Sequence, residues 1–326
     1  MNFFKTPAFA RNRVPVPMPV VALLGCFVLT ACGGGSSDTT TTSSTASSGS
    51  GTSTSTAGVL CDYSSSLFNS SPSVNATATA TWSCSSTLRS LTTNGLPDHA
   101  VGIFPNANNP NTIAARNTSV SGKLTPTLTS AITAQSGPGV VMGYVLNGIK
   151  LDPGTAGTCD DTGNNCDPGR TVGAWNLEGI GGAFAFGTDV NNAHVQPDGA
   201  YHYHGIPEGF VAKLNKGQAM TLVGWAADGF PVYARYGYSI ATDATSALKV
   251  IKSSYRIKSV PDAKRPAISL LPMGTFTQDF EYLAGLGDLD ECNGRSGVTP
   301  EFPKGIYHYY ATESYPYLQR CVKGQI

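Results

Sequence analysis

The stretch DGAYHYHGIPEGF, residues 198–210, sets two histidines and two tyrosines in alternation. In a β-strand alternate residues point to the same face, so His202 and His204 would project together on one side and Tyr201 and Tyr203 on the other. Two imidazoles side by side repel each other when both are charged and lose hydration when both are buried. A metal ion, a reacting group or plain exposure to solvent would remove this conflict.

The segments outward from this stretch have the character of strands. They are rich in Val, Thr, Tyr and Trp and are separated by NG, DPG, PDG and ADG turns, as in VNATATATWSC (74–84), GVVMGYVLNGIKL (139–151) and AMTLVGWAADGFPVYARYGYSI (219–240). The best helix candidates are short, TSAITAQ (129–135) and PDAKRPAISLL (261–271), and no repeat of fixed period is present. We therefore predict a mainly β fold: one large, disulfide-stapled, sandwich-like β domain with long ordered loops and few short helices.

The beginning of the chain has a different composition. Positive residues precede an apolar run, residues 20–31, that is too short to span a bilayer and has the form of a secretory signal. Small residues before Cys32 and glycines after it are typical of a bacterial lipoprotein signal. We interpret residues 1–31 as the lipoprotein signal peptide, 32–58 as the lipidated Cys32 with a flexible Ser/Thr/Gly-rich tether, and 59–326 as the folded domain.

This organisation predicts a cell-envelope protein that is attached to a membrane through its N-terminal lipid anchor. Gly33, rather than Asp, follows the cysteine, which favours the outer membrane of a Gram-negative bacterium; a periplasmic or a surface orientation stays open. The full chain has a formal net charge of +0, which argues against nucleic-acid binding, because that function requires a basic face. No nucleophile elbow, phosphate-binding loop or dinucleotide fingerprint is present either.

Six cysteines remain in residues 59–326. An even number in an exported chain favours disulfides, and a zinc–thiolate site is disfavoured because no Cys-x-x-Cys pair is present. Sequence alone does not choose among the possible pairings. Proximity along the chain suggests Cys61–Cys84, Cys159–Cys166 and Cys292–Cys321.

Six blocks carry a resemblance to a known family: TTNGLPDHAVGIFPNANNPNTI (92–113), YVLNGIKLDPGTAGTC (144–159), NNAHVQPDGAYHYHGIP (191–207), LVGWAADGFPVYARYGY (222–238), DFEYLAGLGDLDECNGR (279–295) and TPEFPKGIYHYYATESYPYLQRCVKG (299–324). On these blocks, which cover most of the chain after the tether, the sequence resembles the YHYH-domain proteins of bacteria. A second motif reads YHYY, so Tyr310 replaces one histidine of an apparent pair. The resemblance implies no settled reaction, and the chemistry has to be argued from the residues.

All five histidines lie in these blocks: His99, His194, His202, His204 and His308. Three protein ligands with one open position are a common arrangement for a catalytic or transport metal. His202 and His204 would supply two ligands, His308 is our first choice for the third, and His194, across the QPDG turn, is the second. Neutral imidazole suits copper and zinc alike. The alternative is that these side chains form a polar surface or satisfy buried hydrogen bonds.

Carboxylates offer further candidates. Asp228, in an Asp-Gly turn after an apolar segment, could act as a general base beside a metal-bound water, and Glu208 and Glu178 are weaker candidates for this role; a plain turn is the ordinary role of Asp-Gly. Two acidic loops, CDDTGNNCDPG (159–169) and GDLDECNG (287–294), could hold a structural calcium ion. Turn formation beside a disulfide explains both loops equally well.

Two functional hypotheses follow. In the first, the histidines of a lipid-anchored envelope protein bind a copper- or zinc-type ion for storage, delivery or metal-dependent chemistry on a small substrate, which leaves open whether the protein is an enzyme. In the second, a metal-free envelope module recognises a glycan or a protein partner through a tyrosine-rich surface. Convergence of His202, His204 and His308 within a few ångströms would favour the first.

Overall fold

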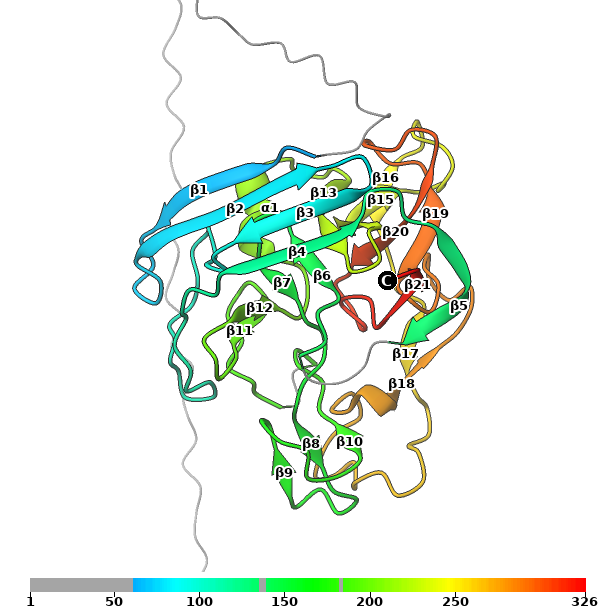
Figure 1. Cartoon of the computed structure of the whole chain (residues 1–326). Helices are drawn as coiled ribbons and strands as arrows, with labels where there is room; N and C mark the ends of the chain where they lie inside the picture. Colours follow the sequence, from blue (N-terminus) through cyan, green and yellow to red (C-terminus); the bar gives the residue numbers. More distant parts are fainter. Residues whose placement is uncertain (1–60, 135–138, 182–183) are drawn as a thin grey trace, which may run out of the picture. The chain divides into compact units, whose positions relative to one another are not determined.

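Strands rather than helices organise the chain. The computed structural model describes residues 61–134, 139–181 and 184–326, which belong to one compact unit (Figure 1). Within these ranges the chain forms strands β1 to β21, one α-helix and one 3-10 turn, so the predicted mainly β fold is confirmed. The signal peptide, Cys32 and the tether inferred from the sequence lie outside the described residues.

The first four strands form an antiparallel meander in the order β1-β2-β3-β4, with bounds β1 Ser64–Asn69, β2 Ala76–Cys84, β3 Leu88–Thr93 and β4 Thr118–Lys123. The alternation of Ala and Thr in β2 explains how this sheet is oriented. Ala78, Ala80 and Trp82 are buried on one face, while Thr77 and Thr81 are exposed on the other. One face of the meander is therefore available for packing against a second layer.

The second layer is an eight-stranded mixed sheet in the order β11-β12-β7-β6-β13-β14-β20-β19. Its strands β13 and β14 are buried along their whole length, which explains why they read as continuous apolar runs rather than alternating ones. The bounds are β6 Gly143–Val145, β7 Lys150–Leu151, β11 Ala193–Val195, β12 Tyr201–Tyr203, β13 Thr221–Ala226, β14 Pro231–Ala234, β19 Gly294–Gly297 and β20 Ile306–Ala311.

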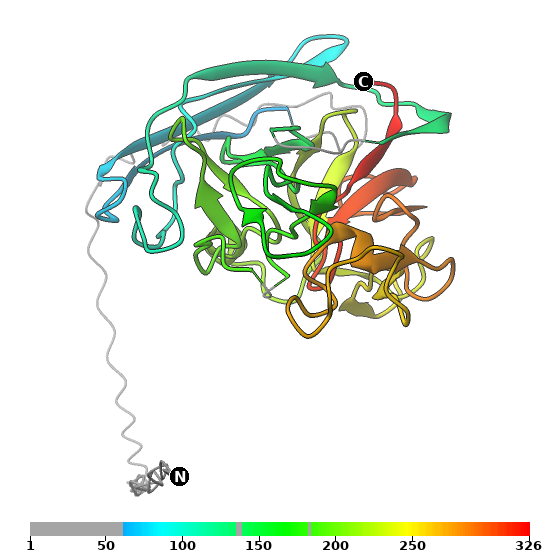
Figure 2. The same cartoon turned by 90° about the horizontal axis from the view of Figure 1, so that it is seen from below.

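The two layers share one hydrophobic core. Trp82 of β2 packs in this core and donates its indole N–H to the Leu146 carbonyl of the β6–β7 turn at 2.8 Å. The Arg89 guanidinium of β3 stacks 3.3 Å from the centre of the Trp225 ring of β13. In Figures 1 and 2 the blue-to-cyan strands of the meander accordingly lie along one side of the green and yellow strands. The predicted sandwich-like layering is present in this part of the domain.

Smaller sheets complete the fold. A three-stranded sheet, β10-β8-β9, carries a second small hydrophobic cluster that includes Trp175, Leu177 and Phe276. Three two-stranded sheets pair β15 with β16, β17 with β18, and β21 with β5. The bounds are β5 Leu128–Ala134, β8 Thr158–Cys159, β9 Cys166–Asp167, β10 Trp175–Asn176, β15 Tyr236–Tyr238, β16 Leu248–Val250, β17 Tyr255–Ile257, β18 Phe280–Tyr282 and β21 Cys321–Gly324.

Three disulfides join these parts, and they are the pairs that proximity suggested. Cys61–Cys84 ties the start of the domain to the end of β2, Cys159–Cys166 links β8 to β9, and Cys292–Cys321 connects the segment before β19 to β21. The choice that the sequence left open is thus made in favour of the pairs nearest along the chain.

Both helix candidates were wrong. Residues 129–134 belong to strand β5, because this segment is rich in Thr and pairs with β21. Residues 261–271 form turns in which the Arg265 guanidinium donates to the carbonyls of Pro266, Leu271 and Pro272, so side-chain bonds replace a helical ladder. The observed helix, α1 (Glu208–Leu214), follows Pro207 and buries only Phe210, and a 3-10 turn, η1, spans Thr277–Asp279. Neither helix of the described residues has the length and apolar character of a membrane span.

Candidate metal site

A short hairpin at the edge of the eight-stranded sheet carries the candidate site. Strands β11 and β12 are antiparallel, and His194 lies directly opposite His202. The turn between them is closed by a hydrogen bond from the Gly199 amide to the Gln196 carbonyl at 2.8 Å, and Gly199 has φ +90°, a conformation that favours glycine. The QPDG turn thus folds His194 back onto the face of β12 that carries His202.

Three imidazoles converge on this face. His204 extends the alternation of β12, and its Nε2 atom lies 3.0 Å from His194 Nε2 and 3.0 Å from His202 Nε2. One ligand atom from each of the three side chains lies within 4.8 Å of the others. A tetrahedral metal with bonds of about 2.0–2.1 Å holds its nitrogen ligands about 3.3 Å apart, which is close to the observed contacts.

Backbone carbonyls fix the orientation of two rings. His194 Nδ1 donates to the Phe186 carbonyl at 3.0 Å, and His202 Nδ1 donates to the Ala200 carbonyl at 3.2 Å. With the proton on Nδ1, the lone pair of each ring lies on Nε2 and points into the cluster. This is the arrangement in which histidines that bind metals are held by a second layer of acceptors.

The cluster is not satisfied by its own hydrogen bonds. If His204 carries its proton on Nε2, it can donate a good hydrogen bond to only one of the two neighbouring atoms, His194 Nε2 and His202 Nε2. The buried Nδ1 atom of His204 is then left without a well-formed hydrogen bond. Burial lowers the pKa of all three rings, and the neighbouring imidazoles lower those of His202 and His204 further. The rings are therefore neutral, and a cation at their centre would accept the three converging lone pairs.

The chain approaches His204 closely from a third segment. A Cβ atom at Gly179 would lie 2.7 Å from His204 Nδ1, so only glycine fits over the ring. The adjacent Glu178 is buried and accepts a hydrogen bond from Arg320 at 2.8 Å. This ion pair holds Glu178 beside the cluster as a partner of Arg320, and the positive charge of Arg320 contributes to the lowered pKa of His204.

A polar network borders the cluster on the side of β7. Lys150 is the cross-strand neighbour of His202, and its ammonium donates to Gln196 at 2.5 Å and to Asp152 at 3.3 Å. Gln196 in turn donates to the same Asp152 oxygen at 2.9 Å. The other oxygen of Asp152 is buried without a hydrogen-bond partner, and burial raises the pKa of this carboxyl.

A cavity opens next to the histidines. Its volume is about 630 Å³, and both His194 and His202 line it. Phe186 and Val195 supply apolar wall, and Gln196 and Asn111 supply polar groups. A cavity of this size with both apolar and polar lining is typical of a small-molecule site, and it borders two of the three histidines.

His308 lies elsewhere in the same sheet. In the strand order β20 is the seventh strand and β12 the second, so five strand spacings, about 24 Å at about 4.8 Å each, separate His308 from His202. His308 instead places its Nε2 atom 3.2 Å from the Tyr310 hydroxyl. The expected order of third ligands is therefore reversed: His194 joins His202 and His204, and His308 does not.

The catalytic candidates Asp228 and Glu208 do not belong to the cluster of three histidines and have other partners. Asp228 accepts hydrogen bonds from the Tyr309 hydroxyl at 2.6 Å and from the Gly324 amide at 2.8 Å, so it holds the β13–β14 turn against β20 and β21. Glu208 begins α1, and both of its carboxylate oxygens accept from one guanidinium nitrogen of Arg235, at 2.6 and 2.7 Å. Asp228 therefore has the turn-forming role that is ordinary for Asp-Gly, and Glu208 pairs with an arginine.

Neighbouring side chains and backbone amides donate hydrogen bonds to the carboxylates of the two acidic loops. Asp160 accepts from Thr162 and Gly163, and Asp161 accepts from the Trp175 indole. In the second loop Asp290 accepts from Tyr307 and from the amides of Cys292 and Gly294, while Lys249 pairs with Asp288 and Lys323 with Glu291. These contacts fit the turn-forming interpretation of both loops.

The tyrosines of the two motifs point into the core. Tyr201, Tyr203, Tyr307, Tyr309 and Tyr310 are each at most 5% exposed. Tyr203 lies behind the imidazoles, where its hydroxyl is 2.5 Å from His99 Nε2 and accepts from the Asn147 side chain at 3.1 Å. An exposed tyrosine platform for glycans or proteins is therefore not built from these motifs, because burial satisfies their rings and hydroxyls internally.

Several residues of the site escaped the sequence reasoning. Asp152 and Lys150 stand only two positions apart in IKLD, and nothing local links them to the distant His-x-His pair. Phe186 contributes a backbone carbonyl, which no side-chain pattern reveals. The alternation in IKLD after an NG turn could have shown that Lys150 and Asp152 share one face of a strand, but not that this strand is the neighbour of β12.

Comparison with known proteins places the chain in a family. Searches of curated proteins and of solved structures returned no match. A family model described as "YHYH protein" matches residues 120–324, a range that contains the β11–β12 hairpin, the three converging histidines and the second motif in β20. This match covers more than half of the sequence. The chain is therefore a member of the YHYH protein family.

Proposed function

We propose that His194, His202 and His204 bind a transition-metal ion of the copper or zinc type. The observation that carries the proposal is the convergence of three Nε2 atoms, with two of the rings oriented by backbone carbonyls. Imidazole nitrogens suit both metals, and three protein ligands leave a fourth coordination position for water or a substrate. A bound ion would polarise such a ligand or lower the pKa of a bound water.

The cavity beside His194 and His202 supports access for a small molecule. Its mixed lining would bury apolar parts of a ligand while a few polar groups orient it. Metal-dependent chemistry on a small substrate is therefore the form of the first hypothesis that we favour over storage alone. Among the carboxylates we favour Asp152, which pairs with the cross-strand neighbour of His202, and Glu178, which precedes the glycine packed on the His204 ring.

We also propose that the protein acts in the cell envelope, attached through lipid on Cys32. The support is the sequence alone: a short apolar run, small residues before the cysteine and a polar tether after it. Metal and substrate would then reach the site from the envelope compartment, where the disulfides of the domain persist.

The decisive experiment measures metal binding by the full-length protein. Metal-free protein is titrated with Zn²⁺ and, separately, with Cu²⁺, and stoichiometry is checked by elemental analysis after dialysis. We expect one ion per chain, and we expect the His202→Ala, His204→Ala double variant to lose it.

A matched pair of single variants separates this site from general histidine binding. His194→Ala should weaken Zn²⁺ binding by at least tenfold, whereas His308→Ala should leave it unchanged, because His308 lies about 24 Å away along the sheet. Circular dichroism confirms that each variant is folded. Equal affinity in the wild type and the double variant, with both metals, would rule out the proposed site.

A further inference from the structure

The eight-stranded sheet consists of two halves with the same topology. In one half the β6–β7 hairpin is followed, after a long insertion, by the β11–β12 hairpin, whose second strand pairs parallel to β7. In the other half the β13–β14 hairpin is followed by the β19–β20 hairpin, whose second strand pairs parallel to β14. The halves meet where β6 and β13 pair antiparallel, so the strand order reads the same from either edge.

The cross-strand register relates the halves residue by residue. Gly143 faces Leu151, and the equivalent Gly224 faces Val232. Tyr144 in β6 and Trp225 in β13 are equivalent residues of the two halves, and they are also cross-strand partners of each other. A two-fold axis that passes between β6 and β13 requires this pairing. A Cβ atom at Gly143 would lie 2.3 Å from the Trp225 carbonyl oxygen, and one at Gly224 would lie 2.3 Å from the Tyr144 carbonyl oxygen. The close approach is therefore the same from both sides.

The turns repeat the correspondence. The first hairpin turns through Asn147 and Gly148, with the glycine at φ +83°, and the second turns through Asp228 and Gly229, with the glycine at φ +89°. The side chain of each turn residue then contacts the second tyrosine of a motif. Asn147 donates to the Tyr203 hydroxyl at 3.1 Å, and Asp228 accepts from the Tyr309 hydroxyl at 2.6 Å.

The first tyrosines of the motifs are held alike. Tyr201 donates to Asp189 at 2.8 Å, and Tyr307 donates to Asp290 at 2.9 Å. Three residues after each aspartate, Asn192 and Asn293 adopt positive φ values of 56° and 60°. The carbonyls of these asparagines accept from the amides of His204 and Tyr310 at 2.8 and 3.0 Å, respectively. The equivalence thus extends to the residue that follows β12 and its counterpart in β20.

This frame gives each ligand of the metal site a counterpart. His202 corresponds to His308, because each is the cross-strand partner of the residue on the edge strand: His194 in β11 and Arg295 in β19. The Nδ1 atoms of both histidines donate to the carbonyl two residues earlier, at 3.2 Å in His202 and 2.9 Å in His308. His204 corresponds to Tyr310. The second half therefore carries Arg295, His308 and Tyr310 where the first carries three histidines.

We propose that Arg295, His308 and Tyr310 form a second, closed copy of the metal site, in which a guanidinium group supplies the positive charge that a metal ion supplies in the first. This proposal rests on the proposed function only in taking the ligand to be a metal ion. The equivalence of the two halves of the sheet follows independently from the strand register and the hydrogen bonds described above. Replacing the two departing residues by histidine should reopen the copy to a transition-metal ion.

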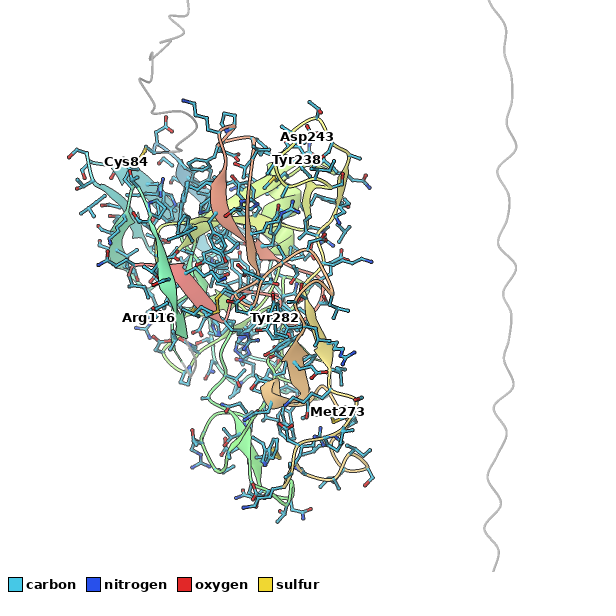
Figure 3. All side chains as sticks on the ribbon, turned by 90° about the vertical axis from the view of Figure 1, so that its right-hand side faces the viewer. Cys84, Arg116, Tyr238, Asp243, Met273 and Tyr282 are labelled. Atoms are coloured by element: carbon cyan, nitrogen blue, oxygen red, sulfur yellow. A yellow bond between two sulfur atoms is a disulfide. The ribbon has the colours of Figure 1, made fainter. Side chains whose placement is uncertain are left out.

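The contacts of the second cluster show how it is closed. Arg295 donates to the Tyr310 hydroxyl at 3.2 Å and to the Tyr238 carbonyl at 2.8 Å; Tyr238, in β15, is labelled in Figure 3. The hydroxyl of Tyr310 lies 3.2 Å from His308 Nε2 and can donate to it. The Tyr310 hydroxyl therefore occupies the lone pair of His308, and the Arg295 guanidinium lies beside that hydroxyl. A metal ion at this position would find its histidine ligand already hydrogen-bonded and would be repelled by the positive charge of the arginine.

The forward test is the full-length Arg295→His, Tyr310→His double variant. Equilibrium dialysis against Zn²⁺ should find one more ion per chain than in the wild type, and Co²⁺ should add the visible absorption of a second nitrogen-ligated site. The matched control is Arg295→Gln, Tyr310→Phe, which removes the charge and the hydroxyl without adding ligands and should bind no additional Zn²⁺. A folded Arg295→His, Tyr310→His variant with no additional ion overturns the proposal.

The outcomes distinguish this proposal from the proposed function. One ion in both wild type and variant refutes only the second copy; none in the wild type and one in the variant refutes only the first site; none in either refutes both.

The reverse exchange keeps the proposal falsifiable if the forward variant does not fold. The His194→Arg, His204→Tyr double variant should fold, should bind no Zn²⁺, and should melt in EDTA at or above the temperature of His194→Ala, His204→Ala. Arginine, histidine and tyrosine at the equivalent positions of the second half satisfy one another by hydrogen bonds. Alanines at positions 194 and 204 would instead leave a cavity and unpaired polar groups. Melting below the alanine variant contradicts the equivalence of the two copies.

Discussion

Acidification should destabilise the domain through His308, and the size of the effect follows from the burial of this side chain. His308 is fully buried, and burial lowers its pKa to about 4, with the charge of Arg295 acting in the same direction against the hydrogen bond to the Ile306 carbonyl. In the unfolded chain an imidazole has a pKa of about 6.5. Below that value the unfolded state therefore binds a proton that the folded state does not, so stability falls as the pH drops from about 6.5 towards about 4.

These two pKa values set the magnitude. Between pH 8 and pH 5, His308 should remove about 2 kcal/mol from the free energy of unfolding, and about 3 kcal/mol well below pH 4, where both states are protonated. The other four histidines contribute as well, so the effect is measured as a difference. Urea unfolding of the wild type and of His308→Gln is compared at pH 8, 7, 6 and 5 in EDTA, with the disulfides intact.

Glutamine does not titrate and can still accept a hydrogen bond from Tyr310, so the variant should lose less stability on acidification than the wild type by about 2 kcal/mol at pH 5. The same pH dependence in the two proteins would falsify the assignment of a buried, neutral His308. A smaller loss in the wild type than in the variant would reverse the sign and contradict the reasoning outright.

Three further predictions concern the other features of the chain. Loss of the Cys292–Cys321 disulfide, whose cysteines are 29 residues apart, should lower the free energy of unfolding by about 3.6 kcal/mol. Loss of Cys159–Cys166, whose cysteines are 7 residues apart, should lower it by about 2.4 kcal/mol. Denaturant titration of the paired Cys→Ala variants checks this order, and a larger loss from the shorter loop contradicts the chain-entropy argument. Cys32→Ala should move the protein out of the detergent phase in a phase-partition assay, and unchanged membrane association would count against the anchor. Zn²⁺ affinity should persist below pH 6.5, because burial lowers the pKa values of His194, His202 and His204, and a binding midpoint at or above pH 6.5 in a pH titration would be inconsistent with these buried rings.

Local patterns predicted the elements of the fold well. The Ala/Thr alternation of β2 and the apolar runs of β13 and β14 were recognisable as strands, because side-chain period and burial follow from the pleat itself. The short helix α1 was missed because it buries a single residue, Phe210, and therefore has no apolar stripe. The sequence of residues 129–135 does not reveal a strand, because the pairing of β5 with β21 depends on a segment almost two hundred residues away.

The sequence predicts the two histidines at the centre of the candidate site, but it does not predict which residue completes the cluster. The spacing of His202 and His204 implies that the two rings share a face, and the turn before them allows His194 to join. The order of strands decides between His194 and His308, and that order depends on which strands pair in parallel across long connections. Such pairing is set by packing of the whole core, for instance of Trp82 and Leu146 between the two layers, and no short pattern encodes it.

The tyrosine on the reverse of β12 has a consequence for the energetics of ligand binding. Because the Tyr203 hydroxyl is held by Asn147 and lies against His99, the position of the strand is defined by the core, independently of anything that occupies the opposite face. The strand is therefore preorganised, and the carbonyls of Phe186 and Ala200 fix the rings of His194 and His202 when the domain folds, before a ligand arrives. Association then requires little rearrangement of the protein, so less of the interaction energy of the three nitrogens is lost to ordering the site.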